Sequence, residues 1–348
     1  MSPLAIAPAK ETIAIRVLGR FVFGIIVLLV IAENSLAATF SNPLGAGSDP
    51  WVVFFDGYYY YSGSDGGNKV VITKAEKLQD IRSASKITVW TAPEDTVYSR
   101  QLWAPELHYL RGKWYIYVAA DDGVNANHRM YVLEGSTQNP QDPFVLKGKI
   151  SAPTDRWAID GTVFSFNDDE LYLVWSGWDD VRNVAQNLYI ASMSDPWTIS
   201  SERVLIAAPT YSWEKRVGEG GPLINEGPAV LKRGSELFII YSASGSWTDD
   251  YCLGQLRYKG GSFLNKASWE KKATPVFSKT DFVFGPGHAS FVTSPDGTQD
   301  WIVYHAAKYS GSGWNRNIRI QPFTWHADGS PNFGAPLNEG VPLEEPAT

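Results

Sequence analysis

The amino-acid sequence predicts an all-β protein, a five-bladed β-propeller, on three observations. Apolar residues alternate with a period of two rather than 3.6, in runs rich in aromatic and β-branched side chains. Turn sequences such as Asp56-Gly57 and Arg111-Gly112 separate these runs and supply the positive φ of tight hairpins. One layout of strand, hairpin, aromatic strand and third strand recurs five times along the 348 residues.

In chain order, the predicted strands and turns follow this layout. The aromatic or β-branched strands are expected at 51–55 with 58–62, 114–119, 171–175, 237–242 and 301–306. Aspartates that fall in the hairpin turns are interpreted as structural: Asp56, Asp168, Asp169 and Asp296. Helical patterns are scarce, and only 74–81 is expected to form a short helical turn.

The five repeats place a polar residue at the same point. These residues are Asp49, Glu106, Asp160, Glu226 and His288, which lie 54 to 66 residues apart. Repeats of that size with about four strands each are typical of propeller blades, whereas two β-sandwiches would not repeat a polar position. The first strand of every blade lines the central channel, so we expect the five side chains to form a ring at one end of the axis.

Composition excludes several classes of protein. Hydrophobic residues make up 44% and charged residues 19% of the chain, which suits a packed core and not a disordered segment. The formal net charge of −7 argues against a nucleic-acid-binding surface, which needs clustered Lys and Arg. The single cysteine, Cys252, leaves no intrachain disulfide framework and no Cys-rich zinc site, and we expect it to be buried.

The first 38 residues have the order of a secretory signal peptide. An apolar run at 21–32 follows three basic residues, and small residues at 35–38 follow the run. A membrane span needs about 20 apolar residues, and the long segment before the run leaves a retained anchor open as the alternative. We predict a signal peptide over 1–38, one folded domain over 39–348, secretion, and no stable membrane association after cleavage.

Five short motifs, one per repeat and all in order, carry a resemblance to a known family. They are Ser48-Asp49-Pro50-Trp51, Trp103-Ala104-Pro105-Glu106, Ala158-Ile159-Asp160-Gly161, Asn225-Glu226-Gly227-Pro228 and Gly287-His288-Ala289-Ser290-Phe291. Residues 42–348 resemble glycoside hydrolase family 43, the five-bladed propeller enzymes that cut arabinans and xylans. The resemblance implies a catalytic domain over 39–348.

The resemblance implies a role for three carboxylates in inverting hydrolysis. Asp49 matches the general base, which stays ionised to accept a proton from water, and Glu226 matches the general acid, which protonates the leaving oxygen. Asp160 matches a third acid, which orients Glu226 and raises its pKa by like-charge repulsion. Inversion needs the acid and the base roughly 6.5–9.5 Å apart. For Glu106 the resemblance implies no catalytic role.

Other residues are expected to bind the sugar. Arg316 matches a family arginine that reaches the non-reducing-end sugar, with Arg319 as the competing residue. Trp51, Trp103 and Trp178 are candidate stacking platforms. His288 matches a histidine near the channel centre, in some members beside calcium or water. Calcium prefers oxygen ligands, so the resemblance requires no cofactor and leaves a calcium ion near the axis, with His288 holding a water, as an open alternative.

Taken together, these features favour a secreted, inverting, exo-acting α-L-arabinofuranosidase. The stretches WAPELHYLRGKWYIYVAADDG, WAIDGTV and SASGSWTDDY resemble the arabinofuranosidase branch of the family. Its expected substrates are oligosaccharides of plant cell-wall arabinan or arabinoxylan. The alternatives are a β-xylosidase, an endo-1,5-α-L-arabinanase and, from another class, a sugar-binding propeller without catalysis.

Overall fold

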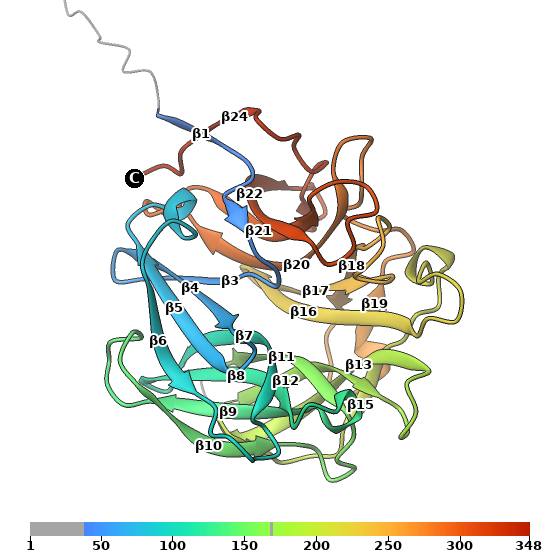
Figure 1. Ribbon diagram of the computed structural model, residues 1–348. Helices are drawn as coiled ribbons and strands as arrows, with labels where there is room; N and C mark the ends of the chain where they lie inside the picture. The colour runs from blue at the N-terminus through green and yellow to red at the C-terminus, as the bar shows by residue number, and fades with distance from the viewer. Residues whose placement is uncertain (1–37, 168–169) are drawn as a thin grey trace, which may run out of the picture. The chain divides into compact units, whose positions relative to one another are not determined.

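The computed structural model describes residues 38–167 and 170–348 (Figure 1). The predicted signal peptide therefore lies outside the described residues except for Ala38, as do Asp168 and Asp169. Within these ranges the chain forms strands and short 3-10 helices and no α-helix: η1 (Leu78–Asp80), η2 (Asn125–Asn127), η3 (Ser212–Glu214) and η4 (Lys266–Ser268). No helix in the described ranges is long and apolar enough to cross a membrane.

The strands of the described ranges form five successive antiparallel units, here called blades I to V. Blade I contains β3 (Trp51–Phe55), β4 (Tyr58–Asp65), β5 (Lys69–Ala75) and β6 (Lys86–Thr91). Blade II contains β7 (Arg100–Leu110), β8 (Lys113–Asp121), β9 (Arg129–Gly135) and β10 (Phe144–Ile150). Blade III contains β11 (Ala158–Phe166), β12 (Glu170–Trp178) and β13 (Ala185–Asp195), with β14 (Thr198–Ile199) and β15 (Val204–Ala207) both paired to β13.

Blades IV and V follow the same plan. Blade IV contains β16 (Leu223–Arg233), β17 (Glu236–Ala243), β18 (Cys252–Tyr258) and β19 (Trp269–Lys271). Blade V contains β20 (Phe284–Thr293), β21 (Asp300–Ala307) and β22 (Arg316–Trp325), with β2 (Gly45–Ala46) and β23 (Pro331–Asn332) both paired to β22. A short parallel pairing of β13 with β16 joins blades III and IV, and β1 (Thr39–Ser41) pairs with β24 (Pro342–Glu344).

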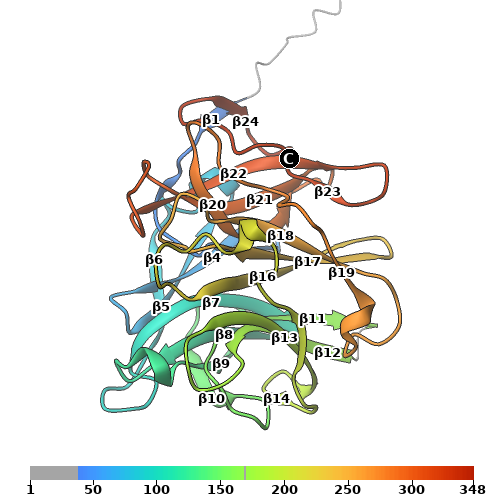
Figure 2. The same ribbon diagram turned by 90° about the vertical axis from the view of Figure 1, so that its right-hand side faces the viewer.

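The first strands of the blades lie next to one another in a closed ring (Figures 1 and 2). Strand β3 contacts β7, β7 contacts β11, β11 contacts β16, β16 contacts β20, and β20 returns to β3. This closure is the arrangement of a β-propeller, as the sequence predicts. The five units are consistent with the predicted five blades.

The segment before blade I completes blade V. Strand β2 pairs antiparallel with β22, with Gly45 opposite Ile318. The buried side chain of Asn42 accepts a hydrogen bond from the Ile320 N–H (2.9 Å) and donates one to the Ile320 carbonyl (2.7 Å). The two ends of the propeller are therefore joined through backbone groups of β22.

The hairpin turns follow from the residues that the sequence provides. Asp56 and Gly57 have φ of 49° and 80°, and Arg111 and Gly112 have φ of 47° and 81°. Two successive positive φ values are typical of a type I′ turn, whose twist matches the strands it connects. The carboxylate of Asp296 accepts hydrogen bonds from the Ser294 hydroxyl and the Thr298 N–H, which supports its structural interpretation.

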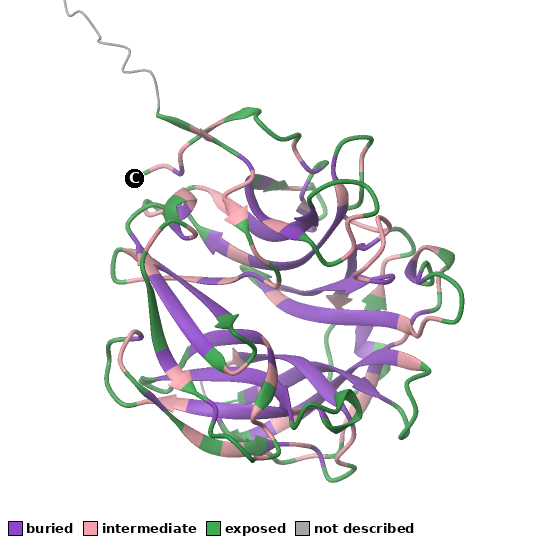
Figure 3. Ribbon diagram, in the orientation of Figure 1, coloured by how far each residue is buried: buried purple, intermediate pink, exposed green. Residues whose placement is uncertain are grey.

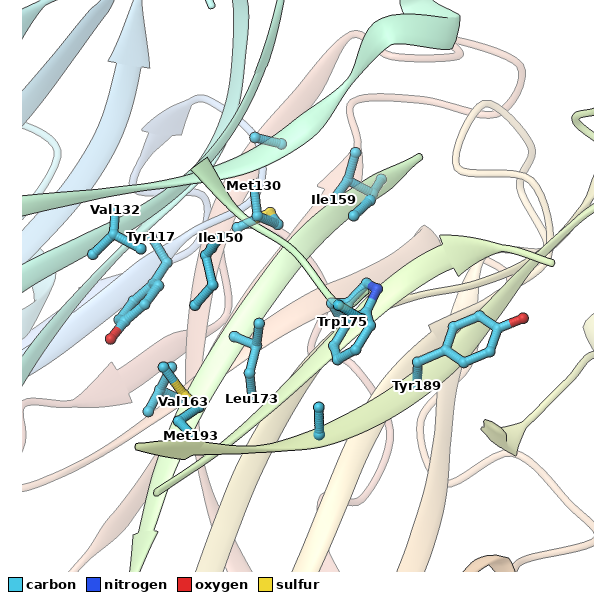
Figure 4. Packing of buried hydrophobic residues seen from close by; sticks show 14 of the residues in the cluster. Tyr117, Met130, Val132, Ile150, Ile159, Val163, Leu173, Trp175, Tyr189 and Met193 are labelled. Carbon is cyan, nitrogen blue, oxygen red and sulfur yellow. The ribbon is translucent and has the colours of Figure 1, made fainter. Parts of the chain in front are cut away.

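The hydrophobic core is divided among the interfaces between neighbouring blades. In the described part of the chain, buried apolar side chains form five clusters, each drawn mainly from two adjacent blades. Figure 3 shows the burial concentrated along the strands, with exposure in the connecting loops. Figure 4 shows the cluster between blades II and III, which includes Tyr117, Met130, Val132, Ile150, Ile159, Val163, Leu173, Trp175, Tyr189 and Met193. Cys252 is buried in the cluster between blades III and IV, as expected.

Candidate active site

A left-handed residue recurs at the same point near the start of every blade's first strand. These residues and their φ values are Asp49 (51°), Ala104 (42°), Asp160 (54°), Gly227 (53°) and His288 (48°). In blades II to V the strand register slips at this point: Trp103/Glu106, Ile159/Thr162, Glu226/Ala229 and Gly287/Ser290. Such bulges re-aim side chains, and a non-glycine residue in this conformation costs about 1–3 kcal/mol. The repeated strain is the kind that accompanies functional sites.

Four of the five polar residues predicted to form a ring line one cleft of about 560 Å³. They are Asp49, Asp160, Glu226 and His288. The fifth, Glu106, is buried and does not line the cleft, so the prediction of a five-membered ring is wrong there. Its carboxylate lies 2.9 Å from Nε2 of His108, and burial, reinforced by the charge of Asp160, raises its pKa well above the usual value.

The carboxylate of Asp49 is held in its ionised form. Its Oδ1 lies 3.1 Å from Nδ1 of His288 and 3.7 Å from Nη1 of Arg316, and its N–H donates to Nδ1 of His305 (3.0 Å). Burial opposes ionisation, but His288, His305 and Arg316 together lower the pKa of Asp49 well below its usual range. Burial also lowers the pKa of His305 to about 3, so near neutral pH Arg316 is the permanent positive charge of this group.

The carboxyl group of Glu226 is held close to its titration point at neutral pH. Burial raises its pKa to about 7, and the charge of Asp49 adds to this effect. The hydroxyl of Tyr251 donates a hydrogen bond to Oε1 of Glu226 (2.9 Å), which works in the opposite direction because it stabilises the carboxylate. A protonated Glu226 and an ionised Asp49 in one cleft can together perform acid–base catalysis.

Asp160 contacts the backbone immediately after Glu226. The N–H of Gly227 donates to Oδ2 of Asp160 (3.0 Å), and both Asp160 and Glu226 are buried. Burial raises the pKa of Asp160 well above its usual value, with the charges of Glu226 and Asp49 adding to the effect. The resemblance implies that repulsion by Asp160 raises the pKa of Glu226. In the structure burial is the largest cause, the charge of Asp49 adds to it, and the repulsion between Asp160 and Glu226 is expressed in the raised pKa of Asp160.

The family to which the chain belongs follows from a match along almost all of the described blades. The sequence model of glycosyl hydrolases family 43 matches residues 40–331, which include every blade. The chain belongs to glycosyl hydrolases family 43.

Relatives within this family are similar over most of the chain. An extracellular exo-α-(1→5)-L-arabinofuranosidase of Streptomyces avermitilis is 39% identical over 89% of this chain and 66% of its own length. α-L-Arabinofuranosidase 43 of Humicola insolens is 37% identical over 84% of this chain and 62% of its own length. The chain thus spans slightly less than two thirds of these relatives. The crystal structure of α-L-arabinofuranosidase from Lactobacillus brevis matches with a TM-score of 0.80 at 37% identity, covering 87% of this chain and 98% of that one.

Between the two arginines that the sequence left open, the family 43 cleft contains Arg316. Its side chain is buried at the start of β22, and Nη1 lies 2.8 Å from Nε2 of His305. Arg319 is also buried, but it donates to the Leu337 carbonyl (3.3 Å) and lies 3.7 Å from Glu339. Of the two arginines, Arg316 is therefore the one that lines the cleft.

Of the three tryptophans predicted as stacking platforms, Trp103 lines the cleft. Its ring stacks on His128 with centroids 3.9 Å apart, and Nδ1 of His128 lies 2.9 Å from Asp121. The buried pair of His128 and Asp121 therefore fixes the position of the Trp103 ring.

The expectation for Trp51 and Trp178 is wrong, because neither lines the cleft. Trp51 packs in the interface of blades I and II, where its indole N–H donates to the Leu107 carbonyl (2.8 Å). Trp178 is buried and stacks on Trp157 with centroids 4.8 Å apart, which leaves Trp157 as the member of the pair at the cleft. Their rings already have aromatic or backbone partners within the fold.

Several residues that line the cleft or contact its carboxylates were not predicted from the sequence. His305 interrupts the apolar run of β21, which is its only signal in the sequence, and its Nδ1 accepts a hydrogen bond from the Asp49 N–H. Tyr251 contacts Glu226 from the loop before β18; it ends the stretch SASGSWTDDY, but nothing in that stretch points to a contact with Glu226. Trp247 and Trp314 lie in loops, where aromatic residues have no periodic signal.

The side chains at the cleft bear on whether it could hold a metal ion. In residues 38–167 and 170–348 no three His, Cys, Asp or Glu side chains are grouped as metal ligands. His288 is 3.1 Å from Asp49 and is thereby paired within the protein. Calcium takes 6–8 oxygen ligands, so an ion near His288 would need water molecules for most of its coordination.

Proposed function

We propose that the protein is a secreted, inverting, exo-acting α-L-arabinofuranosidase. The observation that carries the proposal is the pair of carboxyl groups in one cleft, Asp49 with a lowered pKa and Glu226 with a pKa raised to about 7. The names of the relatives from Streptomyces avermitilis and Humicola insolens support arabinofuranoside hydrolysis, and the first of these names also supports an extracellular location. The substrates of this protein would be arabinan or arabinose-substituted plant polysaccharides.

In the proposed reaction, Asp49 accepts a proton from a water molecule as the water oxygen bonds to the anomeric carbon. Glu226 donates its proton to the glycosidic oxygen as the bond from that oxygen to the anomeric carbon breaks. Asp160 holds the backbone beside Glu226 through the Gly227 N–H. Arg316 would donate hydrogen bonds to sugar hydroxyls while its charge keeps Asp49 ionised. Each proton transfer contributes about 10²- to 10⁴-fold in rate.

The experiment that tests the proposal is proton NMR of the first products from linear 1,5-arabinan, with xylobiose in parallel. Arabinose that appears first as the β-anomer supports exo action and inversion together. Initial release of the α-anomer would contradict inversion.

The same experiment separates the alternatives. Xylose from xylobiose without arabinose from arabinan would indicate a β-xylosidase, and a mixture of oligosaccharides from arabinan would indicate an endo-arabinanase. Bound but uncut oligosaccharides would indicate a sugar-binding propeller.

A further inference from the structure

Two loops at the cleft are fastened to each other. The first, here called loop IV, comprises 244–251 between β17 and β18, and the second, loop V, comprises 308–315 between β21 and β22. The carboxylate of Asp249 in loop IV accepts hydrogen bonds from the Ser310 hydroxyl (2.5 Å) and the Gly311 N–H (2.8 Å) in loop V. Each loop contributes one tryptophan to the cleft, Trp247 from loop IV and Trp314 from loop V.

The two tryptophans are held in defined positions. Their rings meet edge to face with centroids 5.9 Å apart. The indole N–H of Trp247 donates to the Val217 carbonyl (3.1 Å), and that of Trp314 donates to the Ser246 hydroxyl (3.1 Å). Trp314 nevertheless remains 67% exposed. A large aromatic ring that is fixed by its polar atom and open at a cleft presents an apolar face to a ligand.

The position of loop IV indicates on which side of the scissile bond the two tryptophan rings lie. Tyr251, the last residue of loop IV, donates its hydroxyl hydrogen bond to Glu226. A general acid must lie beside the oxygen that leaves, so the groups next to Glu226 lie on the leaving-group side of the scissile bond. Trp247 belongs to the same loop, and Trp314 is in contact with Trp247.

We propose that Trp247 and Trp314 form an aromatic subsite for the sugar on the leaving-group side. This inference rests on the proposed arabinofuranosidase function and names its substrate class: an arabinose joined to a further sugar, rather than a simple alkyl arabinoside. The apolar face of that sugar packs on the two rings. Asp249 is a positioning residue, because it acts on the subsite by joining the loops.

The test compares two substrates that share the reacting arabinose. Methyl α-L-arabinofuranoside has a leaving group too small to reach the tryptophans, whereas 1,5-arabinotriose places a sugar there. For Trp314→Ala we expect kcat/KM on arabinotriose to fall roughly tenfold more than kcat/KM on the methyl arabinoside, since an aromatic contact contributes about that factor. Trp314→Phe should retain part of the preference.

The matched control is Tyr309→Ala. Tyr309 lies in the same loop and is 62% exposed, but it does not line the cleft, so both substrates should react as in the unchanged protein. Equal losses on both substrates with Trp314→Ala, or no loss on either, would overturn the subsite. Failure of the unchanged protein to cut either arabinoside would instead overturn the proposed function, and the subsite with it.

Discussion

Replacing Tyr251 with Phe removes one hydrogen bond from Glu226 and leaves the packing in place. The hydroxyl of Tyr251 donates to Oε1 of Glu226 at 2.9 Å, and its ring stacks on His305 with centroids 5.5 Å apart. Phenylalanine retains the ring. The ionised form of Glu226 loses a donor, so its pKa should rise above the value of about 7 that it has with Tyr251 present.

The size of the shift follows from the strength of the bond. A hydrogen bond to a charged group contributes about 1.5–3 kcal/mol, and one pKa unit corresponds to about 1.36 kcal/mol. The pKa of Glu226 should therefore rise by about one to two. Since Glu226 must be protonated to act as the acid, the basic limb of the pH profile should move to higher pH by the same amount.

The assay is kcat/KM on arabinotriose across a pH range that covers both limbs. Tyr304→Phe is the control, because Tyr304 is also buried and its hydroxyl donates to Gln321 (3.1 Å) in blade V, away from the cleft. The control should leave both limbs where they are. With Tyr251→Phe, a basic limb that stays in place or moves to lower pH would refute the reasoning that Glu226 is the general acid and that Tyr251 lowers its pKa.

Three further perturbations have defined outcomes. Glu226→Gln keeps the shape and removes the transferable proton, so kcat should fall about 10²- to 10⁴-fold with an unchanged circular dichroism spectrum; near-normal turnover would exclude Glu226 as the acid. Asp160→Asn should move the basic limb to lower pH, because the repulsion between the two carboxyl groups is reciprocal; an unmoved limb with lowered kcat would restrict Asp160 to its Gly227 contact. Asn42→Ala leaves the N–H and carbonyl of Ile320 unpaired at about 1–3 kcal/mol each, so Tm should fall by several degrees in a thermal melt, and an unchanged Tm would contradict the closure role.

The features that could be predicted from the sequence are those set by neighbouring residues. A hairpin such as Asp56-Gly57 needs only two residues that accept positive φ, and the alternation of each strand is read over a few positions. The repeated motif start also places Asp49, Asp160 and Glu226 correctly in one cleft, because a left-handed residue recurs at the start of each blade.

The features that could not be predicted depend on partners from other blades. Trp178 is close in sequence to cleft residues, but its ring is covered by Trp157. His305 acquires its contact with Asp49 only when blade V meets blade I. The raised pKa of Glu226 likewise reflects the burial that the whole ring creates, and a motif of four residues carries no information about burial.

The pairing of β2 with β22 means that the proposed active site can be complete only after the first and last blades have joined. Asp49, the proposed general base, follows β2 by only three residues, so it is held in place by a strand that the ribosome synthesises near the end of the chain. Contacts between such distant segments form late because they close a long loop. Recovery of hydrolysis during refolding should therefore report the last closing step, whereas tryptophan fluorescence reports the earlier formation of individual blades.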